Sequence, residues 1–419
     1  MHRRTVLGGA AASVLVAGCD TPARLAALPA KLRGTGSFQG LPPDTRVVLD
    51  GSDDAVLGHI ATEALQREFA YAAKTGVPEL GAANYLAISG GGENGAYGAG
   101  LLTGWTALGT RPDFKGVTGV STGALIAPFA FLGPAYDQQL ERFYTTIDRR
   151  DVMTSRGLIT ALLRDSLFDS APLLRLIRGA LTPEMIGAIG GEYSEKGRLL
   201  LVATTNLDVP VGVLWNLGAI AASRRRDAPE LIAKILLASA SIPGAFPPVM
   251  IDIASGGQHF QEMHVDGGTV AQVMLYPPSF SSSDFRFDHT PETERLRRRL
   301  ARRPTRLFII RNARPGPDFE TVDRSTLSIA GRAISALIST QGIGDLFQLF
   351  VLARRDGMDY NATWIPESFN ERPTEPFERG YMNRLFQVGR NVIASGNAWS
   401  KYPPGFNPAP LFDRRVTAG

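Results

Sequence analysis

Cysteine is nearly absent from the sequence: Cys19 is the only one among 419 residues. A single thiol cannot close an intramolecular disulfide, so a disulfide-stabilised scaffold is excluded. Net charge is also low, with 44 Lys and Arg against 40 Asp and Glu, and this balance argues against a nucleic-acid partner. Glycine and proline total 73 residues, 45 plus 28, below the roughly 25–30% of low-complexity chains. With 44% hydrophobic residues, the chain can instead bury a large core.

Metal-binding motifs are missing as well. The sequence contains no HExxH pattern, no cysteine pair and no EF-hand loop. We therefore expect neither a metal ion nor a cofactor, and any reaction has to be carried by side chains and backbone groups.

The N-terminus has the pattern of an export signal. Residues 2–19 read HRRTVLGGAAASVLVAGC, which is a basic start, an apolar run and small residues before Cys19. The apolar run from Thr5 to Gly18 has 14 residues, fewer than the roughly 20 that span a bilayer as a helix. The pattern therefore predicts a cleaved signal peptide over residues 1–18.

The end of this signal resembles a bacterial lipobox, from Val16 to Cys19. That resemblance implies cleavage before Cys19 and its acylation, and Asp20 implies retention at the periplasmic face of the inner membrane. Arg3 and Arg4 resemble a twin-arginine export signal. We expect a lipid-anchored protein of the bacterial cell membrane; an ordinary secretory signal with an incidental cysteine is the alternative.

The remainder of the chain divides into four regions. We expect a tether and N-terminal appendage over 19–80, a catalytic core over 81–275, a polar and basic insertion over 276–306, and a C-terminal part of the same domain over 307–419. The insertion holds seven arginines between positions 295 and 306. We interpret it as a solvated surface helix, with contact to anionic phospholipid headgroups as the second interpretation.

Strand-like and helix-like stretches alternate in the expected core. Short apolar runs at 85–88, 116–120 and 199–204 predict strands, and 96–108 and 122–132 predict helices. Such alternation predicts an α/β fold with a mainly parallel sheet and helices on both faces.

The C-terminal part contains an apolar-rich stretch at 324–352. We expect one or two helices there, with a break at Gly342 and Gly344. Packing against the core is the better explanation of its apolar residues than insertion into lipid.

A glycine turn lies between the first predicted strand and helix. It reads Ser-Gly-Gly-Gly-Glu-Asn-Gly over 89–95, and such a turn directs backbone N–H groups toward one point beside a helix N-terminus, which favours an anion. Two anions fit this pattern. One is a catalytic oxyanion; the other is a dinucleotide phosphate, since Gly90, Gly92 and Gly95 match the dinucleotide fingerprint and Asp113 follows about 20 residues on.

A second glycine-flanked turn carries a serine. Gly119-Val120-Ser121-Thr122-Gly123 again lies between a predicted strand and a predicted helix. A serine in so tight a turn is held with its hydroxyl exposed, as in a nucleophile elbow. A purely structural turn is the alternative, because Gly and Ser are common residues.

The third motif is Asp266-Gly267-Gly268, which follows a predicted strand at 263–265. Since the carboxyl ends of parallel strands share one edge of a sheet, we expect Asp266 near both glycine turns. Alone, Asp-Gly-Gly is most often a simple turn. Together, the anion-binding turn, the serine and the acid are the components that acyl transfer requires.

In this order the three motifs resemble those of the patatin-like phospholipases. Stretches at 166–169, 204–208 and 238–249 agree with the family as well, and the resemblance covers about 84–270. It implies a patatin-like three-layer α/β/α fold in a bacterial lipoprotein member of the family.

The resemblance also implies roles for particular residues. Ser121 is the expected nucleophile, Asp266 the expected general base, and the amides of Gly90, Gly91 and Gly92 the expected oxyanion hole. The residues that shape these turns are Gly95, Gly119, Gly123, Gly267 and Gly268. The implied reaction is hydrolysis of carboxylic esters in membrane lipids through an acyl-enzyme on Ser121, with burial raising the pKa of the base.

Three other interpretations fit part of the sequence. An α/β-hydrolase triad would combine Ser121, Asp266 and His289, although His289 lies in a polar loop. A dinucleotide-binding oxidoreductase would use the turn at 90–95 and leave the other two motifs unexplained. In a non-catalytic lipid-binding lipoprotein, the site would have lost its catalytic activity. His264 shares one side of a strand with Asp266, and we expect it to pack or to form hydrogen bonds.

Overall fold

The computed structural model describes residues 24–29, 31–32, 41–76, 80–155, 166–281, 284–285, 290–316 and 321–409. The predicted signal peptide, Cys19 and His289 lie outside these residues.

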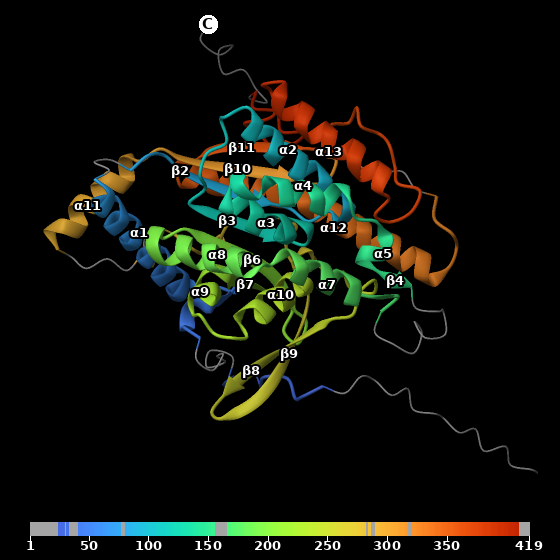
Figure 1. The fold of residues 1–419 in the computed structure, drawn as a ribbon, viewed down its shortest axis with the longest axis horizontal. Coiled ribbons are helices and arrows are strands. Elements are labelled where there is room, and N and C mark those ends of the chain that lie inside the picture. The colour runs from blue at the N-terminus through green and yellow to red at the C-terminus, as the bar shows by residue number, and fades with distance from the viewer. Residues whose placement is uncertain are drawn as a thin grey trace, which may run out of the picture.

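The described elements alternate between strands and helices along most of the chain (Figure 1). The strands are β1 (Arg46–Val48), β2 (Ala83–Ile88), β3 (Gly116–Val120), β4 (Thr154–Ser155), β5 (Phe168–Asp169), β6 (Leu199–Asn206), β7 (Val211–Asn216), β8 (Val249–Ser255), β9 (Gln258–Asp266), β10 (Thr305–Arg311) and β11 (Asp359–Trp364). The helices are α1 (Asp54–Thr75), α2 (Gly95–Ala107), α3 (Thr122–Leu132), α4 (Asp137–Thr145), α5 (Arg149–Val152), α7 (Ala171–Ala180), α8 (Pro183–Lys196), α9 (Leu217–Ala222), α10 (Ala228–Ser239), α11 (Pro291–Arg302), α12 (Thr326–Arg355) and α13 (Arg379–Ala394).

Nine of the described strands form one mixed sheet. Its order is β1-β7-β6-β3-β2-β10-β11, and the β8–β9 hairpin joins it by pairing β9 with β6. The central strands from β6 to β11 are parallel, whereas β1, β7 and β9 pair antiparallel. The predicted α/β class with a mainly parallel sheet is confirmed.

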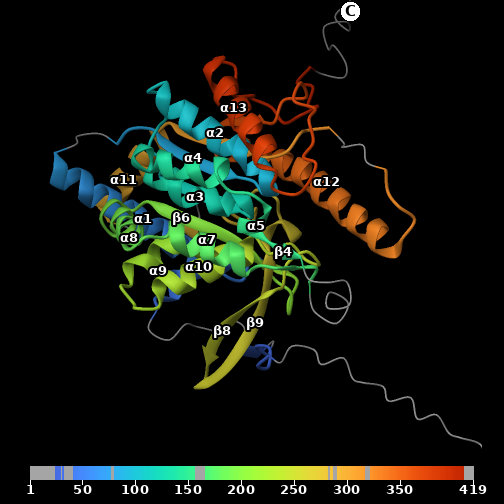
Figure 2. The same ribbon diagram turned by 45° about the vertical axis from the view of Figure 1, so that its right-hand side comes forward.

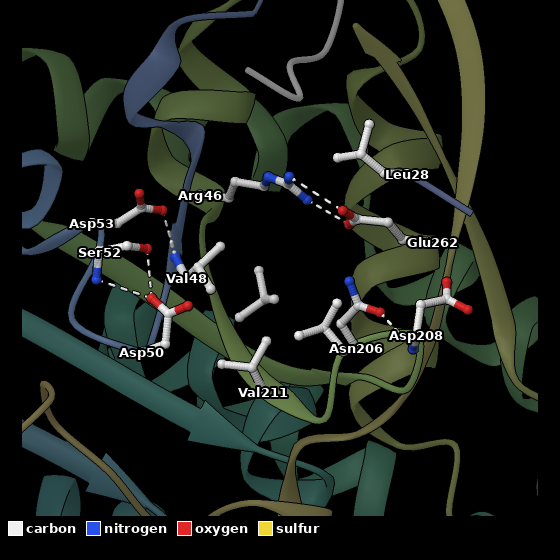
Figure 3. A pocket seen from close by; sticks show the side chains of 12 residues that line it. Leu28, Arg46, Val48, Asp50, Ser52, Asp53, Asn206, Asp208, Val211 and Glu262 are labelled. Atoms are coloured by element: carbon white, nitrogen blue, oxygen red, sulfur yellow. Dashed lines mark hydrogen bonds and ion pairs between the residues drawn. The ribbon is translucent and has the colours of Figure 1, made fainter. Parts of the chain in front are cut away.

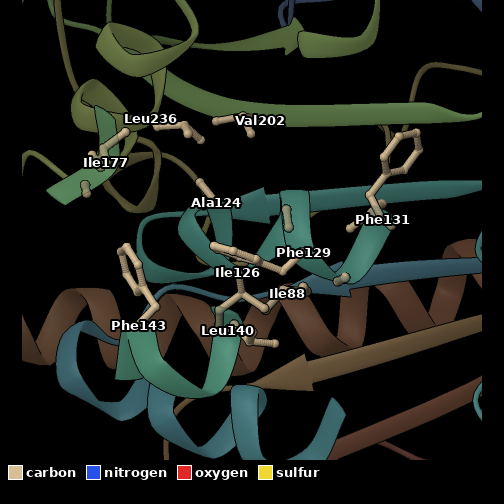
Figure 4. Close-up of a cluster of buried hydrophobic side chains, with 14 of the residues drawn as sticks. Ile88, Ala124, Ile126, Phe129, Phe131, Leu140, Phe143, Ile177, Val202 and Leu236 are labelled. Carbon is tan, nitrogen blue, oxygen red and sulfur yellow. The ribbon is translucent and has the colours of Figure 1, made fainter. Parts of the chain in front are cut away.

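Helices cover both faces of the sheet. On one face α2, α3, α10 and α13 pack against buried strand residues such as Ile88 and Val202. Figure 4 shows these two residues with Ile126 of α3 and Leu236 of α10. On the other face α12 packs against Leu307 and Ile309, and α1 packs against Leu201. Because successive strand residues point to opposite faces, each strand supplies both layers, and each buried aliphatic side chain contributes about 1.5–3 kcal/mol. The arrangement is the three-layer α/β/α fold.

The region before the core contributes to this sheet. β1 pairs antiparallel with β7 at the sheet edge, so residues 46–48 are part of the main fold rather than a separate tether. α1 in turn receives the end of the basic insertion, where the buried Arg303 guanidinium pairs with Glu68 at 2.8 Å and the Arg299 guanidinium lies 5.6 Å from the ring centre of Phe69. At least these two arginines therefore contact protein groups.

α12 is one continuous helix of 30 residues. The predicted break at Gly342 and Gly344 is wrong, because both glycines lie within its helical turns and the chain continues to Arg355. Core packing holds only for its C-terminal half, where Leu346 is fully buried. The N-terminal half is largely exposed and extends away from the rest of the molecule (Figure 2).

The packed half of α12 gives a test of the core. Replacement of Leu346 by Ala should lower the free energy of unfolding by about 2–5 kcal/mol, because the side chain is fully enclosed and its removal leaves a cavity. Val351→Ala on the same helix is the matched control, since Val351 is 63% exposed and should change stability by less than about 0.5 kcal/mol. Urea denaturation measures both; equal losses would contradict the described packing.

Candidate active site

Ser121 occupies a strained turn between β3 and α3. Its φ is 55° and its ψ is −126°, a backbone conformation that residues with a Cβ rarely adopt. The Ser121 N–H donates to Ser239 Oγ at 3.0 Å, and the Ser239 hydroxyl donates to the carbonyl of Ala203 at 2.7 Å. The end of α10 therefore fixes the turn to β6. Ser239 lies in the stretch 238–249 that resembles the family, but the sequence gave no role for its side chain.

Two glycines make this turn possible by their lack of a side chain. A Cβ at Gly119 would lie 2.4 Å from the Gly123 carbonyl oxygen, and one at Gly123 would lie 2.2 Å from the Ile88 carbonyl oxygen. Both distances are far below van der Waals contact, so any other residue would push α3 away from β2 and β3. The Gly-x-Ser-x-Gly pattern thus has a direct steric cause here.

Asp266 reaches Ser121 by a route that the sequence did not predict. The expected strand runs parallel to the others, but β9 is antiparallel to β6 and enters from beyond its carboxyl end. Val120 at the end of β3 pairs with Ala203, and Asp266 at the end of β9 pairs with the next residue, Thr204. Two strands therefore meet end to end along one side of β6, and their last residues bring the serine and the acid together.

The Asp266 carboxylate is almost completely buried, at 4% exposure. Its Oδ1 accepts the Gly268 N–H at 2.7 Å, while its Oδ2 has no hydrogen-bond partner in the described part of the chain. Burial raises the pKa of Asp266 to about 7, and the nearby Ser121 hydroxyl and the Gly268 amide oppose this rise. The carboxylate is thus a much stronger base than an exposed aspartate.

The glycine turn lies directly beside the serine. A Cβ at Gly90 would be 3.0 Å from the Ser121 Cβ. The predicted use of all three amides for an oxyanion needs correction, because the Gly90 N–H already donates to the Gln272 carbonyl at 3.0 Å. Gly91 and Gly92 have positive φ values, and their amides have no acceptor among the described residues. These two N–H groups are the ones available to an anion.

Gln272 connects the glycine turn to the segment after Asp266, residues 267–270, which we call the acid loop. Its carbonyl holds Gly90, its side-chain amide donates to the Gly268 carbonyl at 3.1 Å, and its own N–H donates to Asp345 Oδ2 at 2.6 Å. Asp345 is buried on α12, and burial raises the pKa of this carboxyl to about 6 despite the nearby Arg311. Sequence patterns gave no signal for this connection, because Gln272 and Asp345 are 73 residues apart.

The other side of the glycine turn is held by Ser89 and Asn312. The Asn312 N–H donates to Ser89 Oγ at 2.8 Å, and its side-chain amide donates to the Ser89 carbonyl at 2.9 Å. The Asn312 side-chain carbonyl accepts the Gly98 N–H at 3.0 Å, which ties the turn to α2. Both residues are buried, so the turn is fixed on both sides.

The dinucleotide interpretation does not survive this geometry. The Asp113 carbonyl lies within hydrogen-bond distance of the Asn84 side chain, near the start of β2, whereas the glycine turn follows Ile88 at the end of that strand. The candidate ribose-binding acid and the candidate phosphate-binding turn are therefore at opposite edges of the sheet, and they cannot hold one nucleotide between them.

A largely apolar cavity of about 270 Å³ opens at the serine. Ser121, Thr122 and Gly92 line its polar end. Its apolar wall includes Leu125, Phe143, Ile147, Phe168, Leu173 and Phe246. A hydrocarbon chain fits such a lining, with a reacting group held at the serine.

A second, smaller hollow of about 50 Å³ lies away from the serine, beside β1 and β9 (Figure 3). Its main polar feature is a buried ion pair between Arg46 and Glu262 at 2.5 Å. Glu262 also contacts His264 Nε2 at 3.2 Å, and Thr204 Oγ1 contacts His264 Nδ1 at 2.9 Å.

The proton positions in this network follow from its donors. The Trp215 indole N–H can only donate, and it donates to Thr204 Oγ1 at 2.7 Å. Glu262 stays ionised and can only accept, so His264 donates from Nε2 to Glu262. The other ring nitrogen, Nδ1, then accepts from the Thr204 hydroxyl. Burial lowers the pKa of His264, which favours this neutral form. The expected hydrogen-bonding role of His264 is confirmed.

The described residues contain no group of three or more His, Cys, Asp or Glu side chains able to hold a metal ion.

The Ser239 contact gives a stability test of the turn. Ser239→Ala should lower the free energy of unfolding by about 1–3 kcal/mol, because it leaves the buried Ser121 N–H without its acceptor. Ser241→Ala is the matched control: Ser241 is equally buried, but its hydroxyl bonds the Leu237 carbonyl, which also accepts an N–H from Ala240. Denaturant titration should show the larger loss for Ser239, and equal losses would argue against its role.

Comparison with known proteins identifies the family of this domain. Residues 86–277, which include all three motifs, match the family model described as patatin-like phospholipase. Among solved structures, VipD from Legionella pneumophila is similar at 12% identity and a TM-score of 0.36, over 74% of this chain and 66% of that one, so the chain spans just under two thirds of that neighbour. No curated protein matches. The domain that carries Ser121 and Asp266 is therefore a patatin-like phospholipase domain.

Proposed function

We propose that the protein is a membrane-anchored serine acyl hydrolase that cleaves carboxylic esters of membrane lipids with a Ser121–Asp266 dyad. The observation that carries this proposal is the junction on β6, where Val120 and Asp266 pair with the consecutive residues Ala203 and Thr204. Ser121 follows Val120 directly and lines the polar end of an apolar cavity. The pairing therefore supports a close approach of this strained serine to the buried, basic Asp266 carboxylate.

The first half of the reaction forms an acyl-enzyme. Ser121 Oγ attacks the ester carbonyl carbon while its proton passes to Asp266, whose Oδ2 has no other partner among the described residues. The negative charge that develops on the carbonyl oxygen is stabilised by the amides of Gly91 and Gly92 and by the N-terminus of α3. The protonated Asp266 then returns the proton to the leaving alcohol as the ester C–O bond breaks.

The second half uses the same groups on water. Asp266 accepts a proton from a water molecule as its oxygen attacks the acyl carbonyl, and Ser121 leaves with that proton as the free fatty acid departs. A carboxylate near its ordinary pKa would be a poor base for either step. Burial, which raises the pKa of Asp266 to about 7, brings it close to the value that general-base catalysis requires at neutral pH.

The membrane location is a second part of the proposal. Cleavage before Cys19 and its acylation would leave 401 residues, 419 minus the 18 of the signal. Removal of Arg3 and Arg4 reduces the formal charge from +4 to +2. A nearly neutral protein gains little from electrostatic attraction to lipid, so acyl chains on Cys19 are the main proposed source of attachment at the periplasmic face of the inner membrane.

The dyad predicts a particular dependence on substitution and pH. Ser121→Ala should abolish both lipid hydrolysis and labelling by a fluorophosphonate, and Asp266→Asn should lower kcat by about 10²–10⁴-fold. Because the base acts when ionised and its pKa is about 7, kcat/KM should fall about tenfold per pH unit below 7 and level off above it. Mass spectrometry of fatty acid released from phospholipid vesicles measures these rates.

The matched control for the pH profile is Asp345→Asn. Burial raises the pKa of two further carboxyls near the site, Asp345 to about 6 and Glu93 in the cavity wall. Removal of the Asp345 carboxyl should leave the inflection near 7 in place. The opposite result would be loss of the inflection in the pH profile of Asp345→Asn and its persistence in the residual activity of Asp266→Asn. In that case the general base has been assigned to the wrong residue.

The anchor is tested separately in the membrane fraction of expressing bacteria. Peptides containing Cys19 should carry a thioether-linked diacylglyceryl group, and Cys19→Ser should remove both the modification and the stable membrane association. Mass spectrometry of the N-terminal peptide measures this directly. An unmodified Cys19 in the mature protein would reject the anchor while leaving the dyad untouched.

A further inference from the structure

The exposed N-terminal half of α12 is amphipathic. Taken at 100° per residue, its apolar side chains lie on one broad face, with a narrower polar face opposite. Leu337, Ile329 and Ile334 on the apolar face are 71%, 55% and 42% exposed. We call this face the α12 surface, and its members are Ile329, Ala333, Ile334, Ala336, Leu337 and Ile338.

The polar face of the same segment carries little charge. Ser328, Arg332, Ser335 and Ser339 follow one another at helical spacing along it. Arg332 is the only charged residue between Thr326 and Gly344. The segment therefore combines a large exposed apolar face with a small serine-rich one.

We propose that the α12 surface inserts into the interfacial layer of a lipid bilayer and brings the active site to its substrate. This inference rests on the proposed function, because it assigns the α12 surface to the membrane that contains the ester. A helix that lies in the interface buries its apolar face at the boundary between headgroups and acyl chains.

Length excludes the alternative that α12 crosses the bilayer. By length and composition, Gly331–Arg355 could do so, but Leu346, Leu349 and Leu352 are buried in the protein core. Residues 326–340, which precede the buried part of the helix, extend about 22 Å at 1.5 Å per residue, short of the roughly 30 Å of hydrocarbon. This segment can therefore lie in one leaflet but cannot span both.

Composition favours lipid over a protein partner. Protein interfaces are enriched in aromatic residues and arginine, which carry most of their binding energy. Residues 326–340 contain no aromatic residue and a single arginine. Aliphatic and small side chains partition well into acyl chains, and the family of this domain acts on lipids.

Direct contacts connect α12 to residues that neighbour the catalytic site. A Cβ at Gly342 would lie 3.2 Å from the Cβ of Gln272, whose carbonyl holds Gly90 beside Ser121. The Gln341 side-chain amide donates a hydrogen bond to the carbonyl of Val270, which lies four residues after Asp266. The Val270 side chain is itself 38% exposed. Docking of α12 on a bilayer would therefore hold the acid loop and the glycine turn close to the lipid surface.

Because Cys19 is the only cysteine, insertion can be measured at a single labelled position. In the full chain with Cys19→Ser, Leu337→Cys carries an environment-sensitive dye, and Val351→Cys, exposed at the other end of α12, is the matched control. Phosphatidylcholine vesicles with spin-labelled acyl chains are the probe. We expect quenching of the dye at position 337 and little at position 351, with almost no change when a third of the lipid is anionic or salt is raised to 0.5 M.

Turnover gives an independent readout. The double variant Ile334→Ser, Leu337→Ser should hydrolyse vesicle phospholipid at least about tenfold more slowly, with unchanged turnover of a water-soluble short-chain ester; Val351→Ser should alter neither. An unquenched dye at position 337, or equal loss with both substrates, overturns the inference. The inference is also overturned if sedimentation shows a dimer in which the dye is protected and the lipid does not quench it. Absence of turnover in the parent protein with both substrates instead rejects the proposed function, and the quenching result still decides insertion.

Discussion

The active site depends on how strands share one side of β6. That side pairs with β3 as far as Ala203 and with β9 from Thr204 onward, so two strands of opposite direction meet end to end. The strained turn at Ser121 follows from the same constraint, because β3 has to end where β9 arrives. Backbone hydrogen bonding along a single strand therefore determines the separation of nucleophile and base. Little side-chain movement is needed to bring the two groups together.

Much of this fold follows from local patterns, and the rest depends on distant contacts. The bounds of β3 and α3 match the sequence prediction, because apolar runs broken by Gly119 and Gly123 leave few alternatives. The direction of β9 could not be predicted, since it depends on pairing with β6 about 60 residues earlier. The use of the Gly90 amide by Gln272 is equally non-local, which is why motif reasoning assigned this amide to the oxyanion. The continuity of α12 through Gly342 also depends on tertiary contacts, in which the small residue permits close approach to Gln272.

Three buried carboxylates show how the surroundings of an acid determine its charge. These carboxylates are Asp266, Asp345 and Glu262, and all three are buried. The energetic cost of burying a charge is offset differently at Glu262 and Asp266. The hydrogen bond from His264 and the ion pair with Arg46 outweigh burial and lower the pKa of Glu262 to about 2, so it stays ionised and structural. Asp266 has no such cation among the described residues, and burial raises its pKa, so it can exchange a proton at neutral pH. The contrast between two carboxylates four residues apart on one strand shows how environment separates a structural role from a chemical one.

The β8–β9 hairpin that delivers Asp266 is joined to the sheet through only three residue pairs, whereas its own two strands share seven. Cooperative units of a protein open with different free energies, and those with few contacts to the remainder open first. The hairpin has further contacts, however: Ile251, Ile253 and Phe260 pack in the main core, and Glu262 pairs with Arg46. Attachment of the general base to the sheet therefore depends on side-chain packing more than on backbone pairing, so a substitution in this packing, outside the active site, acts on the position of the base.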